Sequence, residues 1–278
     1  MTLREAYEYG QEQLKEAEIE EAELDAWYLL EHATGITRAK YFMDMNRMLS
    51  EEEEATYREY VSVRAKHIPL QHITGVQEFM GLEFCVNEHV LVPRQDTEVL
   101  VESVLEVLES EMRVLDMCTG SGCSLISLLK VCGFEDVSGV GVDVSEEALQ
   151  VACRNAKKLD VDATFLQSDL FSEVEGQYDM IVSNPPYIRT AVIEELKEEV
   201  KFHDPMLALD GKEDGLYFYR KIIEEAPDYL KLNGRLYFEI GHDQGADVSE
   251  LMRGAGFKEV TVKKDLAGLD RVVFGVYI

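Results

Sequence analysis

The sequence predicts an α/β protein in which a small helical domain precedes a larger domain built on a mostly parallel sheet. From residue 113 onward, short runs rich in Val, Ile and Leu alternate with longer amphipathic segments. This alternation is typical of βα units that form a parallel sheet. Residues 1–75 instead carry Leu, Tyr and Trp at spacings of three to four, or their multiples, among Glu, Lys and Gln, which predicts a small helical bundle.

The N-terminal region has few residues that interrupt helices. Gly10 and Gly35 are the only glycines before Gly75, and Pro69 is the only proline. Ser50 precedes four glutamates, which favours a helix start, because serine caps free N–H groups and acids interact well with the N-terminal end of the helix dipole. We interpret the acidic run as a solvated helix face rather than as a metal or partner site.

Residues 76–95 alternate short apolar runs that are broken at Gly81, which predicts a β-hairpin linker. Pro93 ends this segment, and Asp96 or Thr97 is expected to cap the helix that follows. The domains expected from these patterns are residues 1–75, the linker 76–95, and residues 96–278.

In the larger domain, five strands are each followed by a helix or by a longer insertion. These strands are expected at residues 113–117, 137–143, 163–169, 178–184 and 234–241. Two further extended runs, at 257–265 and 270–278, are separated by only four residues. So short a link cannot hold a crossover helix, so the last two strands must be antiparallel. The prediction is a seven-stranded sheet, parallel except for its last strand.

Composition excludes several classes of protein. An apolar content of 46% provides a proper core and excludes wholesale disorder. The 27 Lys and Arg against 55 Asp and Glu give a net charge of −28, which disfavours binding to DNA, RNA or anionic membranes. No apolar stretch approaches the length of a membrane span, and the N-terminus shows no secretory signal.

The cysteines and histidines point to a cytoplasmic protein without a metal. Five cysteines form no CxxC pair, and their odd number fits no complete disulfide set, so we expect reduced thiols. The six histidines show no zinc-binding spacing.

A glycine-containing turn follows the first strand of the larger domain. It comprises Cys118, Thr119, Gly120, Ser121 and Gly122. A strand, such a turn and a helix form a nucleotide-binding corner, because glycine lets the backbone approach a ligand closely. The dinucleotide fingerprint would require Gly or Ala where Leu125 stands, so the turn fits a smaller ligand better. Alone, the loop is equally well explained as a tight turn without a ligand.

Two further strand ends carry acids. Asp143 ends the second strand of the larger domain, where a carboxylate can accept both ribose hydroxyls of a nucleoside. Asp169 ends the third strand beside Leu170 and Phe171, an edge suited to an adenine amino group and ring face. Each acid taken singly is more often a cap or turn residue. Together with the glycine turn, at the edge where open sheets bind ligands, they predict a nucleoside site.

The most informative segment is Asn184-Pro185-Pro186-Tyr187, at the end of the fourth strand. The prolines fix the backbone and force Asn184 out of helical geometry, giving a rigid shelf. An amide nitrogen is a poor nucleophile, and hydrogen bonds from its N–H groups to the Asn184 side-chain oxygen and the Pro185 carbonyl would position it. Tyr187 can stack on the flat substrate group. Catalysis would then be mainly positioning for methyl transfer.

Around these motifs the sequence resembles the HemK/PrmC family of release factor glutamine methyltransferases over nearly its full length. The resembling segments are Gln71–Gly75, Val92–Glu98, Leu115–Gly122, the Asp143 strand end, Val182–Ile188 and Glu239–Gly241. The run from Pro93 to Glu98, together with Asn184–Tyr187, is the most family-specific pair of motifs.

The resemblance implies a class I fold dependent on S-adenosylmethionine (SAM), with a substrate-recognition N-terminal domain. It implies methylation of the side-chain amide nitrogen of the glutamine in the GGQ loop of release factors. Implied cofactor contacts are Cys118, Thr119, Gly120, Ser121, Gly122, Asp143, Asp169, Leu170 and Asn184, and Asn184, Pro185, Pro186 and Tyr187 would hold the glutamine. The family commonly has glycine at position 118 and in some members an aromatic residue at position 170, departures that concern affinity rather than function.

Other readings stay open. An amino-group methyltransferase acting on DNA or RNA would use the same Asn184–Tyr187 shelf, as would a ribosomal-protein glutamine methyltransferase; a SAM-binding module without catalysis is the third. Residues 95–98 and the negative charge favour release factors. Glu239 either lines the cleft or caps its strand, and residues 194–214 could cover the substrate.

Overall fold

The computed structural model describes all 278 residues and divides into two compact units. The first unit comprises Met1–Val76 and Lys197–His203, and the second comprises Gln77–Leu196 and Asp204–Ile278. No helix in either unit has the length and apolar character that crossing a membrane requires.

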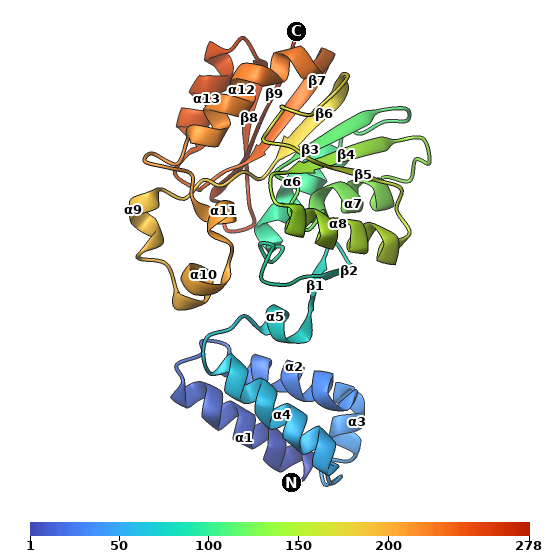
Figure 1. Ribbon diagram of the computed structural model, residues 1–278, viewed down its shortest axis with the longest axis vertical. Coiled ribbons are helices and arrows are strands. Elements are labelled where there is room, and N and C mark those ends of the chain that lie inside the picture. Colours follow the sequence, from blue (N-terminus) through green and yellow to red (C-terminus); the bar gives the residue numbers. More distant parts are fainter. The chain divides into compact units, whose positions relative to one another are not determined.

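The first unit is a bundle of helices (Figure 1). Its members are α1 (Leu3–Glu16), α2 (Ala22–Thr34), α3 (Arg38–Met43), α4 (Glu51–Arg64), α5 (Leu70–Thr74) and α10 (Glu198–His203). The predicted start at Ser50 is confirmed: its hydroxyl accepts the Glu53 N–H while the Glu53 carboxylate accepts the Ser50 N–H. Gly10 lies inside α1 because a Cβ there would stand 1.9 Å from the Tyr57 hydroxyl, so only glycine lets α4 approach so closely.

A buried ion network joins α10 to the N-terminal helices of this unit. The Arg64 guanidinium contacts the Asp25 carboxylate at 2.7 Å and the Glu199 carboxylate at 2.8 Å. Arg64 and Asp25 are both buried. Lys197 and Glu20 form a further ion pair within the same unit. Residues 197–203, which follow the Asn184–Tyr187 segment in sequence, therefore belong structurally to the helical unit.

The second unit contains a seven-stranded sheet in the order β5-β4-β3-β6-β7-β9-β8. The strands are β3 (Arg113–Met117), β4 (Ser138–Asp143), β5 (Thr164–Gln167), β6 (Tyr178–Ser183), β7 (Leu230–Glu239), β8 (Lys258–Lys264) and β9 (Asp270–Val276). The first five pair in parallel, and β9 pairs antiparallel with both β7 and β8. The predicted fold class is therefore confirmed, with both pairings of β9 antiparallel.

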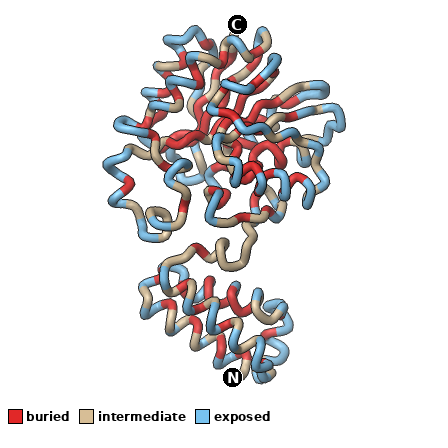
Figure 2. The backbone as a smooth tube through the Cα atoms, in the orientation of Figure 1, coloured by how far each residue is buried: buried red, intermediate tan, exposed pale blue.

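Helices cover both faces of this sheet (Figure 1). The inner strands are mostly buried (Figure 2), whereas the edge strands β5 and β8 hold no buried residue. The covering helices are α6 (Gln95–Leu105), α7 (Cys123–Val131), α8 (Glu146–Leu159), α12 (Tyr217–Tyr229) and α13 (Gly245–Gly254). The unit also contains the short helices α9 (Thr190–Ile193) and α11 (Met206–Leu209). One core layer packs Ile181 of the sheet against Ile222 of α12, and the other packs Val182 with Leu100 of α6. Adjacent strand residues thus face opposite layers, as expected of a sheet buried on both sides.

The segment before the sheet forms a hairpin of β1 (Val76–Phe79) and β2 (Leu82–Cys85). The expected capping of the next helix by Asp96 or Thr97 is wrong. Helix α6 starts at Gln95, and its N-cap, Arg94, makes no side-chain capping bond. Asp96 pairs instead with Arg271 at 3.1 Å, and the Thr97 hydroxyl contacts Asn184. Tertiary partners therefore take the side chains that could have capped the helix.

Candidate active site

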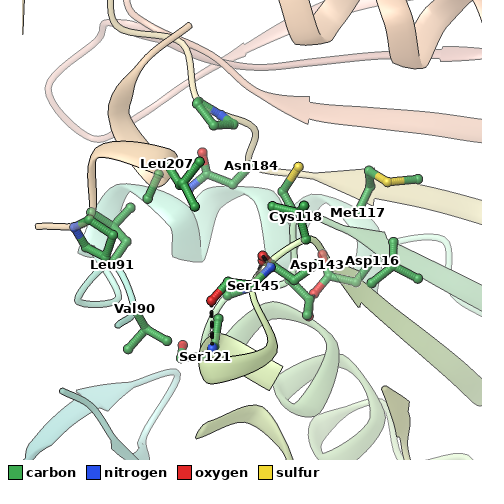
Figure 3. Close-up of a pocket in the computed structure, with 18 of the residues that line it drawn as sticks. Val90, Leu91, Asp116, Met117, Cys118, Ser121, Asp143, Ser145, Asn184 and Leu207 are labelled. Carbon is green, nitrogen blue, oxygen red and sulfur yellow. Dashed lines mark hydrogen bonds between the residues drawn. The ribbon is translucent and has the colours of Figure 1, made fainter. Parts of the chain in front are cut away.

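A pocket opens at the carboxyl ends of β3, β4 and β6 (Figure 3). The order of the sheet reverses at β3, whose neighbours β4 and β6 both follow it in sequence; such a switch point is where open α/β sheets bind ligands. The pocket holds about 1130 Å³ of empty space, its mouth included.

The loop after β3 forms the floor of this pocket. Cys118, Thr119, Gly120 and Ser121 line it, and the φ angles of Cys118, Gly120 and Gly122 are 60°, 56° and 77°, in the left-handed region. The Thr119 side chain fixes the loop to its own strand, because its hydroxyl lies 2.5 Å from a carboxylate oxygen of the buried Asp116. Gly122 does not line the pocket. It caps α7, and a Cβ on Gly122 would stand 2.9 Å from the Ile126 side chain.

Asp143 joins two backbone segments around the pocket. One carboxylate oxygen accepts the Gly120 N–H at 2.9 Å and the other accepts the Ser145 N–H at 3.0 Å. Burial raises the pKa of Asp143, and the backbone N–H groups counteract this rise. Each oxygen accepts one bond from the protein and keeps a lone pair for another donor. A hydroxyl-bearing ligand is the natural donor.

The edge after β5 contributes Asp169 and Leu170 to the pocket lining. The strand ends at Gln167, two residues earlier than predicted. Phe171 does not provide a ring face here. It is buried and stacks on Tyr229, with ring centroids 4.5 Å apart. Leu170 has a φ of 50°, and this turn directs the next side chain into the core.

The Asn184–Tyr187 shelf meets the pocket at its first and third residues. Asn184 and Pro186 line the pocket, whereas Pro185 and Tyr187 do not. The preceding Ser183 hydroxyl donates to the Met117 carbonyl at 2.8 Å, which ties the end of β6 to the loop after β3. The Asn184 side-chain Nδ2 donates to the Thr97 Oγ1 at 3.4 Å. Its Oδ1 has no protein donor and remains available as an acceptor.

Tyr187, the last residue of the shelf, contacts a buried glutamate. Its hydroxyl donates to a carboxylate oxygen of Glu239, Oε1, at 3.3 Å. From the sequence, Glu239 is expected either to line the cleft or to cap its strand. It does not line the pocket; it ends β7, and it is only 2% exposed. Its Oε2 is buried without a hydrogen-bond partner. Burial raises the pKa of Glu239 to about 7, while the Thr97 and Tyr187 hydroxyls and the charge of Arg271 oppose this rise.

Some lining residues carry no signal in the sequence. Val90 and Leu91, from the segment after the hairpin, lie across the pocket from Met117 and Cys118 (Figure 3). Pro205, Leu207 and Ala208 add a further wall, so part of the stretch expected to cover the substrate does reach the pocket. Val90 and Leu91 come from an irregular segment, and Leu207 and Ala208 come from the short helix α11; the approach of both segments to the pocket depends on the whole fold.

The pocket thiols are not reactive groups. Cys118 and Cys123 both line the pocket, and burial raises the pKa of both, that of Cys123 to about 12. The thiolate is the nucleophilic form of cysteine, so these side chains stay neutral and inert. All five cysteines of the chain are free.

Comparison with known proteins agrees with this architecture. Residues 5–75 match the PrmC N-terminal domain, and residues 94–200 match the methyltransferase small domain. The chain is 42% identical to the release factor glutamine methyltransferase of Caulobacter vibrioides, over 99% of this chain and 96% of that protein. It is 39% identical to the protein of the same name from Bacillus subtilis, over 98% and 96% of the two chains.

Solved structures show the same fold at lower identity. A methyltransferase from Pyrococcus furiosus matches with a TM-score of 0.53 and 20% identity, over 71% of this chain and 90% of that one. The T. thermophilus 16S rRNA N2 G1207 methyltransferase matches with a TM-score of 0.52 and 16% identity, over 73% of this chain and 50% of that one.

The sheet order, the loop after β3 and the matched methyltransferase domain define a class I SAM-dependent methyltransferase. Within that class, identity across nearly the whole chain places the protein more narrowly. The chain belongs to the release factor glutamine methyltransferase family, which confirms the resemblance found in the sequence.

Proposed function

We propose that this protein transfers the methyl group of SAM to the side-chain amide nitrogen of the GGQ glutamine in peptide-chain release factors, leaving S-adenosylhomocysteine. The observation that carries the proposal is the meeting of Asn184 and Asp143 in one pocket. The first presents an unpaired amide oxygen, and the second presents carboxylate lone pairs. An amide-binding group and a nucleoside-binding group thus share one cavity.

The residues present fit SAM. Asp143 can accept the ribose hydroxyls, and Leu170 offers an apolar surface beside Asp169 for the adenine. A Cβ built on Gly120 meets no protein atom within 4 Å, so open space lies over the loop backbone. We assign cofactor contacts to Cys118, Thr119, Gly120 and Ser121 of the loop and to Asp143, Asp169, Leu170 and Asn184. Gly122 shapes the loop from outside the pocket. The bound cofactor supplies an electrophilic methyl group on a sulfonium.

The protein's part in the reaction is to hold the amide. We assign the two N–H groups of the glutamine to two acceptors, the Asn184 Oδ1 and the Pro185 carbonyl. These oxygens stabilise the positive charge that develops on the glutamine nitrogen as the methyl group is transferred. Pro186 gives the shelf its stiffness, and Tyr187 holds the end of the shelf in place through its hydrogen bond to Glu239. No strong base is needed before transfer, because the methylated nitrogen sheds its proton readily. The rate gain comes mainly from alignment.

The partner is a protein loop rather than a nucleic acid or a membrane. The net charge of −28 opposes the approach of a phosphate backbone, whereas a protruding peptide loop can enter the pocket. Because all five thiols are free, we place the protein in the cytoplasm, where thiols stay reduced.

The decisive experiment is mass spectrometry of a purified release factor after incubation with the protein and SAM. The expected result is a gain of one methyl group on the GGQ glutamine. A release factor with that glutamine changed to alanine is the control and should gain none.

The alternatives are tested in parallel with labelled SAM, duplex DNA, ribosomal RNA and ribosomal proteins. Label that appears only on nucleic acid would favour an amino-group methyltransferase of DNA or RNA. Label that appears only on a ribosomal protein would indicate a ribosomal-protein glutamine methyltransferase. SAM binding without transfer to any of them would indicate a non-catalytic module.

A further inference from the structure

The buried Asn155 of α8 joins two segments that lie far apart in the sequence. Its Oδ1 accepts the Cys85 N–H at 2.7 Å, and its Nδ2 donates to the Cys85 carbonyl at 3.0 Å and to the Ser121 carbonyl at 2.9 Å. The residue is fully buried, and both N–H groups and the oxygen of its amide are engaged. A single side chain therefore ties the end of β2 to the loop after β3.

One of these contacts helps to set the shape of the pocket floor. Ser121 lines the pocket and stands between Gly120 and Gly122, which both have left-handed φ angles. The Gly120 N–H is held by Asp143, and the Ser121 carbonyl is held by Asn155. Because glycine leaves the backbone conformationally free, these two hydrogen bonds restrict the orientation of the peptide groups in the loop.

The other contact restricts the segment that leads to the pocket wall. Beyond Cys85 the chain reaches Val90, which packs with Ala148 and Val151 of α8 and lines the pocket (Figure 3). Ala148, Val151 and Asn155 follow one another at spacings of three and four residues and so lie on one face of the helix. One face of α8 therefore holds the wall through apolar contacts and the floor through Asn155.

We propose that Asn155 is a positioning residue for the cofactor, which couples strand β2 to the loop that forms the pocket floor, so that SAM binding orders both. The inference rests on the proposed function only for SAM as the ligand of the pocket, and not for the methyl acceptor. Coupling between two sites is reciprocal. Loss of Asn155 should therefore weaken SAM binding and also prevent the ligand from ordering β2.

The hairpin has anchors that do not involve Asn155. Phe79 and Phe84 are buried in the core, and the Met80 N–H in the hairpin turn donates to the Glu98 carboxylate at 2.6 Å. Removal of the Asn155 amide should therefore leave the hairpin folded and change its alignment with the loop.

Hydrogen exchange followed by mass spectrometry tests the coupling without any reaction. No residue of β2 lines the pocket, so protection of this strand by a ligand must be transmitted through the protein. In the wild type, saturating S-adenosylhomocysteine should slow exchange of the amides of residues 82–85 by at least about threefold. In Asn155→Ala the ligand should still slow the amides of residues 118–122 but leave those of 82–85 unchanged.

Calorimetry measures the other direction of the coupling. Asn155→Ala should raise the Kd for S-adenosylhomocysteine by at least about tenfold. Lys158→Met is the matched control, because Lys158 also joins α8 to β2, through an exposed ion pair with Glu83 at 2.6 Å. It should keep the Kd within about twofold and the wild-type exchange pattern. Ile223→Ala, a buried truncation in the other core layer, controls for general destabilisation and should keep the Kd within about threefold.

Kinetics with a release factor separate the cofactor from the methyl acceptor. Asn155→Ala should raise the KM for SAM by at least about tenfold and change the KM for the release factor by less than about threefold. Asn155→Ser is the second variant. Its single hydroxyl proton can bond only one of the two backbone carbonyls, so this variant should behave like Asn155→Ala and not like the wild type.

A wild-type protein in which S-adenosylhomocysteine leaves exchange in β2 unchanged would overturn the inference, and this result requires no variant. Wild-type affinity in Asn155→Ala, or an equal loss of affinity in Ile223→Ala, would overturn it as well. A wild-type protein that binds SAM but leaves release factors unmethylated would instead overturn the proposed function. In that case exchange and calorimetry still decide the role of Asn155.

Discussion

The side-chain nitrogen of Gln244 donates a hydrogen bond to the backbone carbonyl of Tyr187 at 3.1 Å. The same nitrogen donates to the Gly215 carbonyl at 3.2 Å, and the Gln244 oxygen accepts from the Gly241 N–H at 2.9 Å. Both N–H groups of this buried amide and its oxygen are therefore engaged. Gln244 fixes the far end of the Asn184–Tyr187 shelf.

Replacing Gln244 with leucine should loosen the shelf. It leaves two buried carbonyls and one N–H without this partner, so we expect a loss of about 2–4 kcal/mol in the free energy of unfolding. We also expect a fall of at least about tenfold in kcat. Urea titration and steady-state kinetics measure the two effects. Ser249 lies on α13, the helix that Gln244 precedes, and is buried with a hydroxyl that has no partner. Ser249→Ala should change neither the stability nor kcat.

Asn184→Ala separates substrate positioning from cofactor binding. The variant removes the unpaired amide oxygen from the pocket but leaves Asp143 and the loop after β3 in place. We expect kcat to fall by at least about 100-fold, while the Kd for S-adenosylhomocysteine stays within about tenfold of wild type. Calorimetry and single-turnover kinetics give both values. An unchanged turnover rate would disprove the role of the amide.

Asp143→Asn should have the converse effect. An amide nitrogen in place of one carboxylate oxygen would face the Gly120 or the Ser145 N–H, donor against donor, and one acceptor for the cofactor would be lost. We expect the Kd for SAM to rise by at least about tenfold. Asp162→Asn, an exposed change near β5, is the control for calorimetry. Equal affinity in the two variants would contradict the ribose assignment.

Alanine substitutions at two glycines of the loop after β3 should affect different properties, stability at Gly122 and SAM binding at Gly120. An alanine Cβ at Gly122 would stand 2.9 Å from Ile126 and 3.1 Å from Ala152, so Gly122→Ala should cost about 2–3 kcal/mol of stability through overpacking and backbone strain. A Cβ at Gly120 points into open space. Gly120→Ala should therefore cost only about 1 kcal/mol of strain and instead weaken SAM binding. Thermal unfolding with and without SAM distinguishes the two variants.

Glu239 should make stability depend on pH in a defined direction. Its pKa rises from 4.5 to about 7 on folding, so the folded state holds the proton more tightly than the unfolded state does. The resulting stabilisation is complete below about pH 4.5 and is lost as pH rises through about 7. The shift corresponds to about 3 kcal/mol. The free energy of unfolding of Glu239→Gln minus that of wild type should therefore increase by up to this amount from pH 4.5 to 8. A difference that stays constant with pH would show that Glu239 keeps its ordinary pKa.

Much of this architecture could be predicted from the sequence because it depends on local patterns. Val- and Leu-rich runs place β3 and β6 correctly, and the short link at 266–269 requires the antiparallel end of the sheet. The acids and glycines at strand ends also predict which edge carries the pocket, because parallel strands bring their carboxyl ends together.

What sequence reasoning missed depends on contacts between distant segments. Gln244 has no local signature, since its importance lies in bonds to residues 187 and 215. Phe171 turns into the core because Leu170 adopts a left-handed backbone, which composition does not reveal. Thr97 is a good capping residue by type, yet its hydroxyl serves Asn184, so a tertiary partner overrides the local preference.

The contact between Arg64 and Glu199 restricts how the helical unit can be exchanged between related proteins. One compact unit is completed by seven residues encoded in the middle of the other, so a crossover near residue 76 would separate Arg64 and Asp25 from Glu199. A chimera whose first 76 residues come from a relative without an arginine at position 64 should leave the Glu199 carboxylate without its partner. Exchange of the helical module between species therefore requires two coordinated breakpoints, one at each end of the stretch 197–203, in addition to the one near residue 76.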